Sequence, residues 1–151
     1  MENYFCPEMN LQDINEISML GLAHIGDGVY ELLTRTMLCR KGYTKVTDLH
    51  RLTVAIVNAP AQAEAMEKLL PLLTDEEMSV YKRGRNTKVN SVPQKADISQ
   101  YHAATGLECL FGWLYLRQQY DRLNELYGTF ADRAVECGMN LEYFMLGIAF
   151  A

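Results

Sequence analysis

The stretch GLAHIGDGVYE, residues 21–31, places a single acid, Asp27, among apolar side chains. Gly26 and Gly28 flank that acid, and a glycine inside a helix costs about 1 kcal/mol relative to alanine. We therefore expect something to approach the chain closely beside Asp27: a second backbone, a metal ion or a phosphate group. A tight helix crossing next to a solvated acid is the simpler interpretation of the same pattern.

Around this stretch, apolar residues recur at the period of an α-helix, and no segment alternates as a strand does. The first long helix is expected to begin after Ser18 or Asn15 and to end near Arg40. Residues 1–14 are expected to be irregular. The sequence thus predicts an all-α chain of six or seven helices. The later helices are expected to begin near Thr47–Asp48, at Pro60, after Thr74, after Asp97 and near Tyr120. At Thr74, Glu77 completes a capping box. They are expected to end near Val57, before Pro71, near Arg83 with Gly84 as the break, near Arg117, and near Cys137 with Gly138 as the stop.

The composition fits one soluble domain of 151 residues with a sizeable core. The four cysteines, Cys6, Cys39, Cys109 and Cys137, lie far apart, which argues against a disulfide framework or a zinc site. No apolar run has the length of about 20 residues that a membrane span needs, and the N-terminus lacks a signal-peptide layout. We therefore expect a cytoplasmic protein.

The charge is unevenly distributed along the chain. The net charge is −5, but residues 81–95 carry five basic side chains and no acid, so the other residues carry −10. A polyanion responds to the local potential more than to the total charge. The sequence predicts that this segment is an exposed basic loop suited to nucleic acid; a solvated loop without a partner is the alternative.

A second acid, Glu108, lies in the apolar segment ATGLECLFGWL, residues 104–114. Burying a carboxylate there is costly unless it is paired, hydrogen-bonded or bound to a metal. If Asp27 and Glu108 face each other across a helical bundle, their oxygens suit Mg²⁺, which uses one or two carboxylates and keeps several waters. Together with a basic segment, this pattern suggests a metal-dependent nuclease.

Four separated motifs then resemble one known family. GLAHIGDGVYELLTR (21–35), KVTDLHRL (45–52), YKRGRNTKV (81–89) and QKADISQYHAATGLECLFGWLYL (94–116) resemble Mini-ribonuclease III in order and spacing, within a region of resemblance from about Ser18 to Leu126. In the wider ribonuclease III family, one acidic motif aligns with Asp27 and a second with Glu108. The resemblance implies an all-α ribonuclease III catalytic domain without a double-stranded-RNA-binding domain, which we assign to residues 15–138. Residues 139–151 are apolar, and we expect them to form a short tail that docks on the body or on another subunit.

The resemblance also implies an activity. It implies a homodimeric, Mg²⁺-dependent endoribonuclease that cleaves double-stranded RNA, leaves 5′-phosphate ends and matures the large-subunit (23S) ribosomal RNA precursor. Asp27 and Glu108 are the expected catalytic and metal-binding residues. A ribosomal protein is a further candidate partner, and no membrane is expected. The expected RNA contacts are Lys82, Arg83, Arg85, Asn86 and Lys88.

The sequence departs from the full-length family members at three positions. Those enzymes carry further acids where this chain has Leu20, Ala23 and Thr105. Because spacings of three, four and seven share one helix face, the acidic face is reduced here. One Mg²⁺ per site is expected, and a second is left open. Glu31 and Thr105 are candidates for an outer shell around the metal, although Glu31 also has the spacing of a surface partner for Arg35.

Three other functions compete with the nuclease. A non-catalytic RNA-binding or ribosome-assembly protein on the same scaffold is favoured by the missing acids. A helical protein-interaction module would need no basic segment. A helix-turn-helix DNA-binding protein would carry its basic residues along a recognition helix, whereas here they are expected in a loop.

Overall fold

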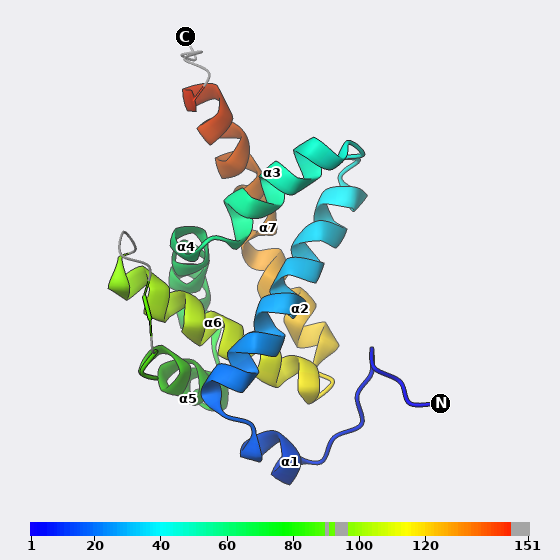
Figure 1. Ribbon diagram of the computed structural model, residues 1–151, viewed down its shortest axis with the longest axis vertical. Coiled ribbons are helices and arrows are strands. Elements are labelled where there is room, and N and C mark those ends of the chain that lie inside the picture. The colour runs from blue at the N-terminus through cyan, green and yellow to red at the C-terminus, as the bar shows by residue number, and fades with distance from the viewer. Residues whose placement is uncertain (90, 93–96, 146–151) are drawn as a thin grey trace.

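The computed structural model describes residues 1–89, 91–92 and 97–145, with the backbone alone at positions 133, 134 and 137–145. All regular structure in these ranges is helical, so the all-α prediction is confirmed (Figure 1). None of the described helices is long and apolar enough to cross a membrane. The helices are α1 (Leu11–Glu16), α2 (Met19–Arg40), α3 (Val46–Val57), α4 (Ala59–Leu69) with a 3₁₀ turn at Leu70–Leu72, α5 (Asp75–Arg85), α6 (Ile98–Leu116) and α7 (Tyr120–Met145).

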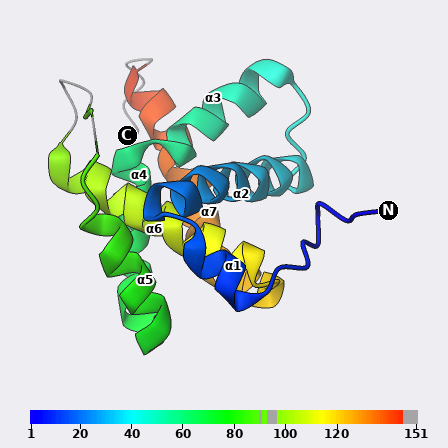
Figure 2. The same cartoon turned by 60° about the horizontal axis from the view of Figure 1, so that its bottom comes forward.

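Helix α6 forms the centre of the molecule. It packs most extensively against α2, and then against α5 and α4, which lie around it in both ribbon views (Figures 1 and 2). Its residues from Ala104 to Leu114 are buried except at Glu108, which is partly buried. A helix that is apolar on all sides is buried on all sides, so the central position of α6 follows directly from its composition.

Two glycines allow α2 and α6 to cross in close contact. A Cβ added at Gly26 would lie 1.7 Å from the carbonyl oxygen of Glu108, and one added at Gly112 would lie 2.1 Å from that of Leu22. Of the three kinds of close approach expected beside Asp27, a second backbone is therefore the one that Gly26 admits. A Cβ at Gly28 would meet nothing within 4 Å, so Gly28 plays no part in this crossing.

Most helices begin directly after a residue whose side chain caps their first turn. The Ser18 hydroxyl accepts a hydrogen bond from Gly21 N at 3.0 Å, and Asn58 Oδ1 accepts one from Ala61 N at 2.9 Å. Thr74 caps α5 in the predicted capping box, and Asp97 caps α6 through Ser99 N at 2.8 Å. Each cap satisfies a backbone N–H that the first turn leaves unpaired.

Some helix bounds differ from the sequence prediction. Helix α1 occupies Leu11–Glu16, capped by Asn10, where irregular chain was expected to residue 14, and α3 begins at Val46 rather than near Thr47–Asp48. Helix α7 continues past Gly138 to Met145, because a single glycine costs only about 1 kcal/mol inside a helix. The last part of the predicted apolar tail, residues 146–151, lies outside the described residues.

Helix α5 does not end at Gly84, as the sequence had suggested, but continues to Arg85. A Cβ at Gly84 would lie 2.6 Å from Cys109 Sγ, so this glycine lets α5 pack closely on α6. Lys82, Arg83 and Arg85 consequently lie on the last turn of a helix and not in a loop.

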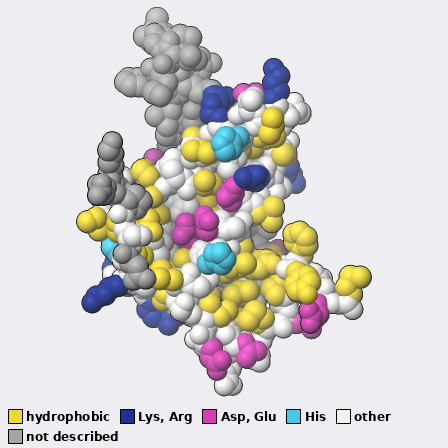
Figure 3. Space-filling view, viewed as in Figure 1, with side chains coloured by type: hydrophobic (Ala, Val, Ile, Leu, Met, Phe, Trp, Pro, Cys, Tyr) yellow, Lys and Arg dark blue, Asp and Glu magenta, His cyan; other side chains and the backbone are white. Residues whose placement is uncertain are grey.

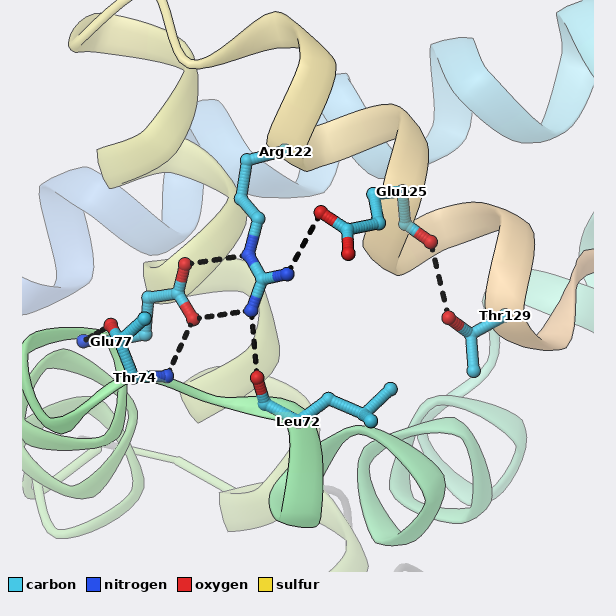
Figure 4. A network of polar contacts seen from close by, with 6 residues as sticks. All are labelled: Leu72, Thr74, Glu77, Arg122, Glu125 and Thr129. Carbon is cyan, nitrogen blue, oxygen red and sulfur yellow. Dashed lines mark hydrogen bonds and ion pairs between the residues drawn. The ribbon is translucent and has the colours of Figure 1, made fainter.

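An arginine from α7 fixes the start of α5. Arg122 Nε donates to Glu77 Oε1 at 2.8 Å, and its Nη2 donates to Glu77 Oε2 at 2.9 Å and to Leu72 O at 2.7 Å (Figure 4). Burial by itself raises the pKa of Glu77, but hydrogen bonds from Arg122 and Thr74 outweigh it, and the pKa is lowered. The pair joins α7 to the capping box of α5, which in turn sets the position of the basic turn.

Candidate active site

Asp27 and Glu108 line one cavity of about 270 Å³. Asp27 comes from the middle of α2 and Glu108 from the middle of α6, and the glycine crossing brings these two helices together at that level. The structure therefore brings the two predicted acids into one site. Other residues of the cavity include Leu20, Ala23, His24, Gln62, Tyr101 and Thr105.

Burial and a neighbouring acid disfavour the ionised form of each carboxyl group. The pKa of Asp27 is raised, first by burial and then by the charge of Glu31, while His24 opposes the rise. Burial, and then the charge of Asp27, raises the pKa of Glu108 to about 7, and a hydrogen bond from Gln62 opposes this rise. Within the described ranges, no lysine or arginine forms an ion pair with either acid.

Two partly desolvated carboxylates without a cationic partner favour a bound cation. The part of the chain that the structure describes contains no cluster of three His, Cys, Asp or Glu side chains that could hold a metal. The site thus offers two carboxylates and room for solvent. This ligand set fits Mg²⁺, which is typically held by one or two carboxylates and keeps several of its waters.

The raised pKa of Glu108 predicts a pH-dependent stability. Because the folded pKa of about 7 exceeds the ordinary value of 4.5, the folded protein binds the proton more tightly than the unfolded chain does. Metal-free protein should therefore lose stability as the pH rises from about 4.5 to 7, by an amount on the order of 3 kcal/mol from this group. Urea unfolding of wild type and Glu108→Gln in EDTA across this range checks it. The difference in unfolding free energy between the two should change with pH, and a constant difference would contradict the burial argument.

The three positions where acids were missing also line the cavity. Leu20 is exposed, Ala23 is buried, and the Thr105 hydroxyl donates to Tyr101 O at 3.0 Å within α6. The reduced acidic face is thus a property of the cavity itself. Thr105 remains a candidate outer residue, but its only hydroxyl proton is used by the helix backbone.

Glu31, a predicted outer-shell candidate, does not line the cavity. Arg35 Nε donates to its Oε1 at 2.9 Å, which confirms the surface pair that the i,i+4 spacing predicted. Its charge still reaches Asp27, whose pKa it helps to raise. Glu31 therefore adds to the negative potential of the site while its side chain is held by Arg35.

Gln62 is a buried polar residue of the cavity lining. It is 1% exposed and lies on α4, on the same face as the buried Ala65, Met66 and Leu69. The sequence signal for this burial is the spacing: the polar residue takes position i, and apolar residues take positions i+3, i+4 and i+7 of the same helix face. Such a residue points into the body of the protein and needs partners there.

The predicted RNA-binding residues form an exposed basic surface at the end of α5. Lys82, Arg83 and Asn86 line an open groove of about 630 Å³, together with Asp75, Met78 and Ser79. Arg85 lies over the Tyr81 ring, 5.6 Å from its centroid, and Lys88 is exposed just beyond the helix. The next residue, Val89, lines the cavity of the two acids, so the chain leads from the basic surface to the site. Lys95, the fifth basic residue of the segment, lies outside the described residues.

Comparisons with known proteins agree in one family. The Ribonuclease III domain model matches residues 20–119. The chain is 43% identical over 124 residues to Mini-ribonuclease 3 of Symbiobacterium thermophilum, covering 82% of this chain and 95% of that protein. It is also 43% identical over 118 residues to Mini-ribonuclease 3 of Enterococcus faecalis, covering 77% and 89%. A crystal structure of a Fusobacterium nucleatum protein superposes with a TM-score of 0.70 at 29% identity, covering 77% of this chain and 94% of that one.

Proposed function

Because the chain belongs to the ribonuclease III family, among the Mini-ribonuclease III proteins, and is therefore an endoribonuclease of double-stranded RNA, we propose that Asp27 and Glu108 hold Mg²⁺ for the cleavage. We further propose that its substrate is the large-subunit (23S) ribosomal RNA precursor, which it cleaves in the cytoplasm. The observation that supports the site is the shared cavity of the two acids, which contains no cationic side chain paired with them among the described residues. Asp27 is exposed and Glu108 is partly buried, and a partly desolvated carboxylate beside a second one is less stable unless a cation neutralises it.

The chain's own residues position the reaction. Asp27 and Glu108 provide oxygen ligands from two helices that are locked together at Gly26, so the site is formed before substrate arrives. Asp27 and Glu108 would hold Mg²⁺, which would supply polarisation of the scissile phosphate and activation of water for hydrolysis. The apolar side chains of Leu20 and Ala23 replace further acids on the cavity wall, so the chain itself offers few ligands for a second ion.

The Mg²⁺ requirement and the product ends test this function. Purified protein is incubated with duplex RNA and with precursor ribosomal RNA, in Mg²⁺ and in EDTA, and the ends are mapped. Cleavage in Mg²⁺ only, with 5′-phosphate and 3′-hydroxyl ends, supports the proposal. Tight binding of RNA that stays intact in Mg²⁺ would instead support the non-catalytic RNA-binding alternative.

The basic turn of α5 is proposed as the main RNA contact. Lys82, Arg83, Arg85 and Lys88 are exposed donors for phosphate oxygens, and Asn86 can bond a 2′-hydroxyl. Lys82, Arg83 and Arg85 lie on the helix end, and Asn86 and Lys88 follow it directly, where the sequence had predicted a loop. Binding along one helical turn fits the wide, shallow minor groove of A-form RNA.

Arg83→Ala with Arg85→Ala is expected to weaken duplex binding and to flatten its salt dependence. Removing one phosphate-binding side chain should reduce the slope of log K against log salt by about 0.9 if the value for B-form duplexes applies, so the slope of the double variant should be smaller by about 1.8. Binding is measured in Ca²⁺ or EDTA over a range of KCl. Arg40→Ala at the far end of α2 is the matched control. An unchanged slope in the double variant would reject this surface.

A homodimer is proposed through the apolar surface beside α2. Ile25, Gly28, Val29 and Leu32 line a shallow apolar pocket of about 260 Å³ with Tyr4, Phe5 and Tyr115. Hydrophobic side chains gather in this region between α2 and the N-terminal segment (Figure 3). Leu32 is 53% exposed in the single chain and belongs to this contiguous apolar surface, and such surfaces mark interaction sites. Sedimentation of wild type and Leu32→Lys tests the dimer, and a wild-type protein that sediments as a monomer, as the variant should, would reject it.

A ribosomal protein is proposed as a further partner on the precursor.

A further inference from the structure

Gln62 presents an incomplete set of hydrogen bonds at the active site. Its Nε2 donates to Val57 O at 3.1 Å, at the end of α3. Its Oε1 is buried and has no partner within the described part of the chain. Since an amide oxygen without a donor in the protein interior is costly, this atom calls for a donor that the cavity receives from outside.

The position of the side chain identifies what it serves. Gln62 lines the same cavity as Asp27 and Glu108, and it is the buried polar residue that α4 contributes there. An amide has two N–H groups and one oxygen. One N–H is used by Val57, the second interacts with the Glu108 carboxylate, and the oxygen is left for solvent held between the acids.

We propose that Gln62 is a positioning residue for the cleavage reaction: its amide group fixes the Glu108 carboxylate toward Asp27, and its Oε1 accepts a hydrogen bond from a water that completes the metal site. The inference rests on the proposed Mg²⁺ site. Partners that orient metal ligands through hydrogen bonds typically contribute about 10- to 100-fold to metal affinity or activity. Because α4 is capped independently by Asn58, the amide is not needed to start its helix.

The test is Gln62→Met, which keeps the length of the side chain and removes its polar atoms. Mg²⁺ affinity, measured by calorimetry without RNA, is expected to fall about 10- to 100-fold. The kcat at saturating RNA should fall in the same range at fixed Mg²⁺, whereas KM for duplex RNA should stay near the wild-type value, since Gln62 is too buried to touch the backbone of the duplex. Unchanged Mg²⁺ affinity and kcat in the folded variant would overturn the proposal.

Thr53→Val is the matched control. Thr53 is also buried, at 3% exposed, and its hydroxyl donates to Leu49 O at 2.7 Å, but it lies on α3 away from the cavity lining. The Thr53→Val variant should at most have a lower free energy of unfolding, and its Mg²⁺ affinity should be unchanged. A merely structural role for Gln62 would make the two variants behave alike.

A measurement on the wild-type protein covers the case in which Gln62→Met fails to fold. The side-chain amide resonances of Gln62 should shift when Mg²⁺ is titrated into ¹⁵N-labelled protein, and those of the exposed Gln119 should not. Absence of a Gln62 shift at saturating Mg²⁺ would reject the proposal. If wild type itself binds no Mg²⁺ and cleaves no duplex, the proposed function fails; if wild type is active and Gln62→Met is equally active, only this inference fails.

Discussion

Gly26→Ala is expected to destabilise the fold by about 3 kcal/mol or more, because the new methyl group would lie 1.7 Å from the carbonyl oxygen of Glu108. Backbone atoms cannot swing aside as a flexible side chain can, so α2 and α6 must separate. Their separation opens the core and also moves Asp27 away from Glu108. Urea unfolding followed by circular dichroism measures the loss.

Gly128→Ala is the matched control for this glycine. It also replaces a glycine within a helix, α7, but the added Cβ meets nothing within 4 Å. This variant should gain up to about 1 kcal/mol from helix propensity. If Gly26→Ala also gained stability, the close crossing of α2 and α6 would be wrong.

Asp27→Asn and Glu108→Gln are each expected to reduce duplex cleavage about a thousandfold at saturating Mg²⁺, since either change removes half of the protein's charge for the metal. Both amides are close to the size of the acids they replace, and Glu108→Gln removes a carboxylate whose ionised form is costly to bury. Single-turnover cleavage of a duplex, with RNA binding measured in parallel, separates a loss of chemistry from a loss of affinity.

Glu64→Gln serves as the control for these two variants. Glu64 is an exposed acid on α4 that pairs with Lys68 at 3.3 Å and lines no part of the cavity. It should cleave at the wild-type rate. Full activity of either Asp27→Asn or Glu108→Gln beside this control would remove that acid from the proposed mechanism.

The sequence predicted the local structure because helix caps and i,i+4 side-chain pairs act within one or two helical turns. Ser18, Thr74 and Asp97 cap helices as predicted, since a cap bonds a backbone N–H two or three residues away. The i,i+4 pair of Glu31 and Arg35 is also local. Local reasoning was wrong at Gly84, which it took for a break, because the space that this glycine provides is used by Cys109 on another helix.

By itself, the sequence determined the helical class, most helix starts, the family, and the two acids on which the proposed chemistry rests. The tertiary structure alone decided that Gly26 serves a helix crossing while Gly28 does not, that the basic side chains end a helix, and that Gln62 shares the cavity with Asp27 and Glu108. The physical reason is one of range. Periodicity and capping are fixed by neighbours along the chain. Close approach and cavity lining instead depend on which distant helices pack together, and a single sequence does not show which helices these are.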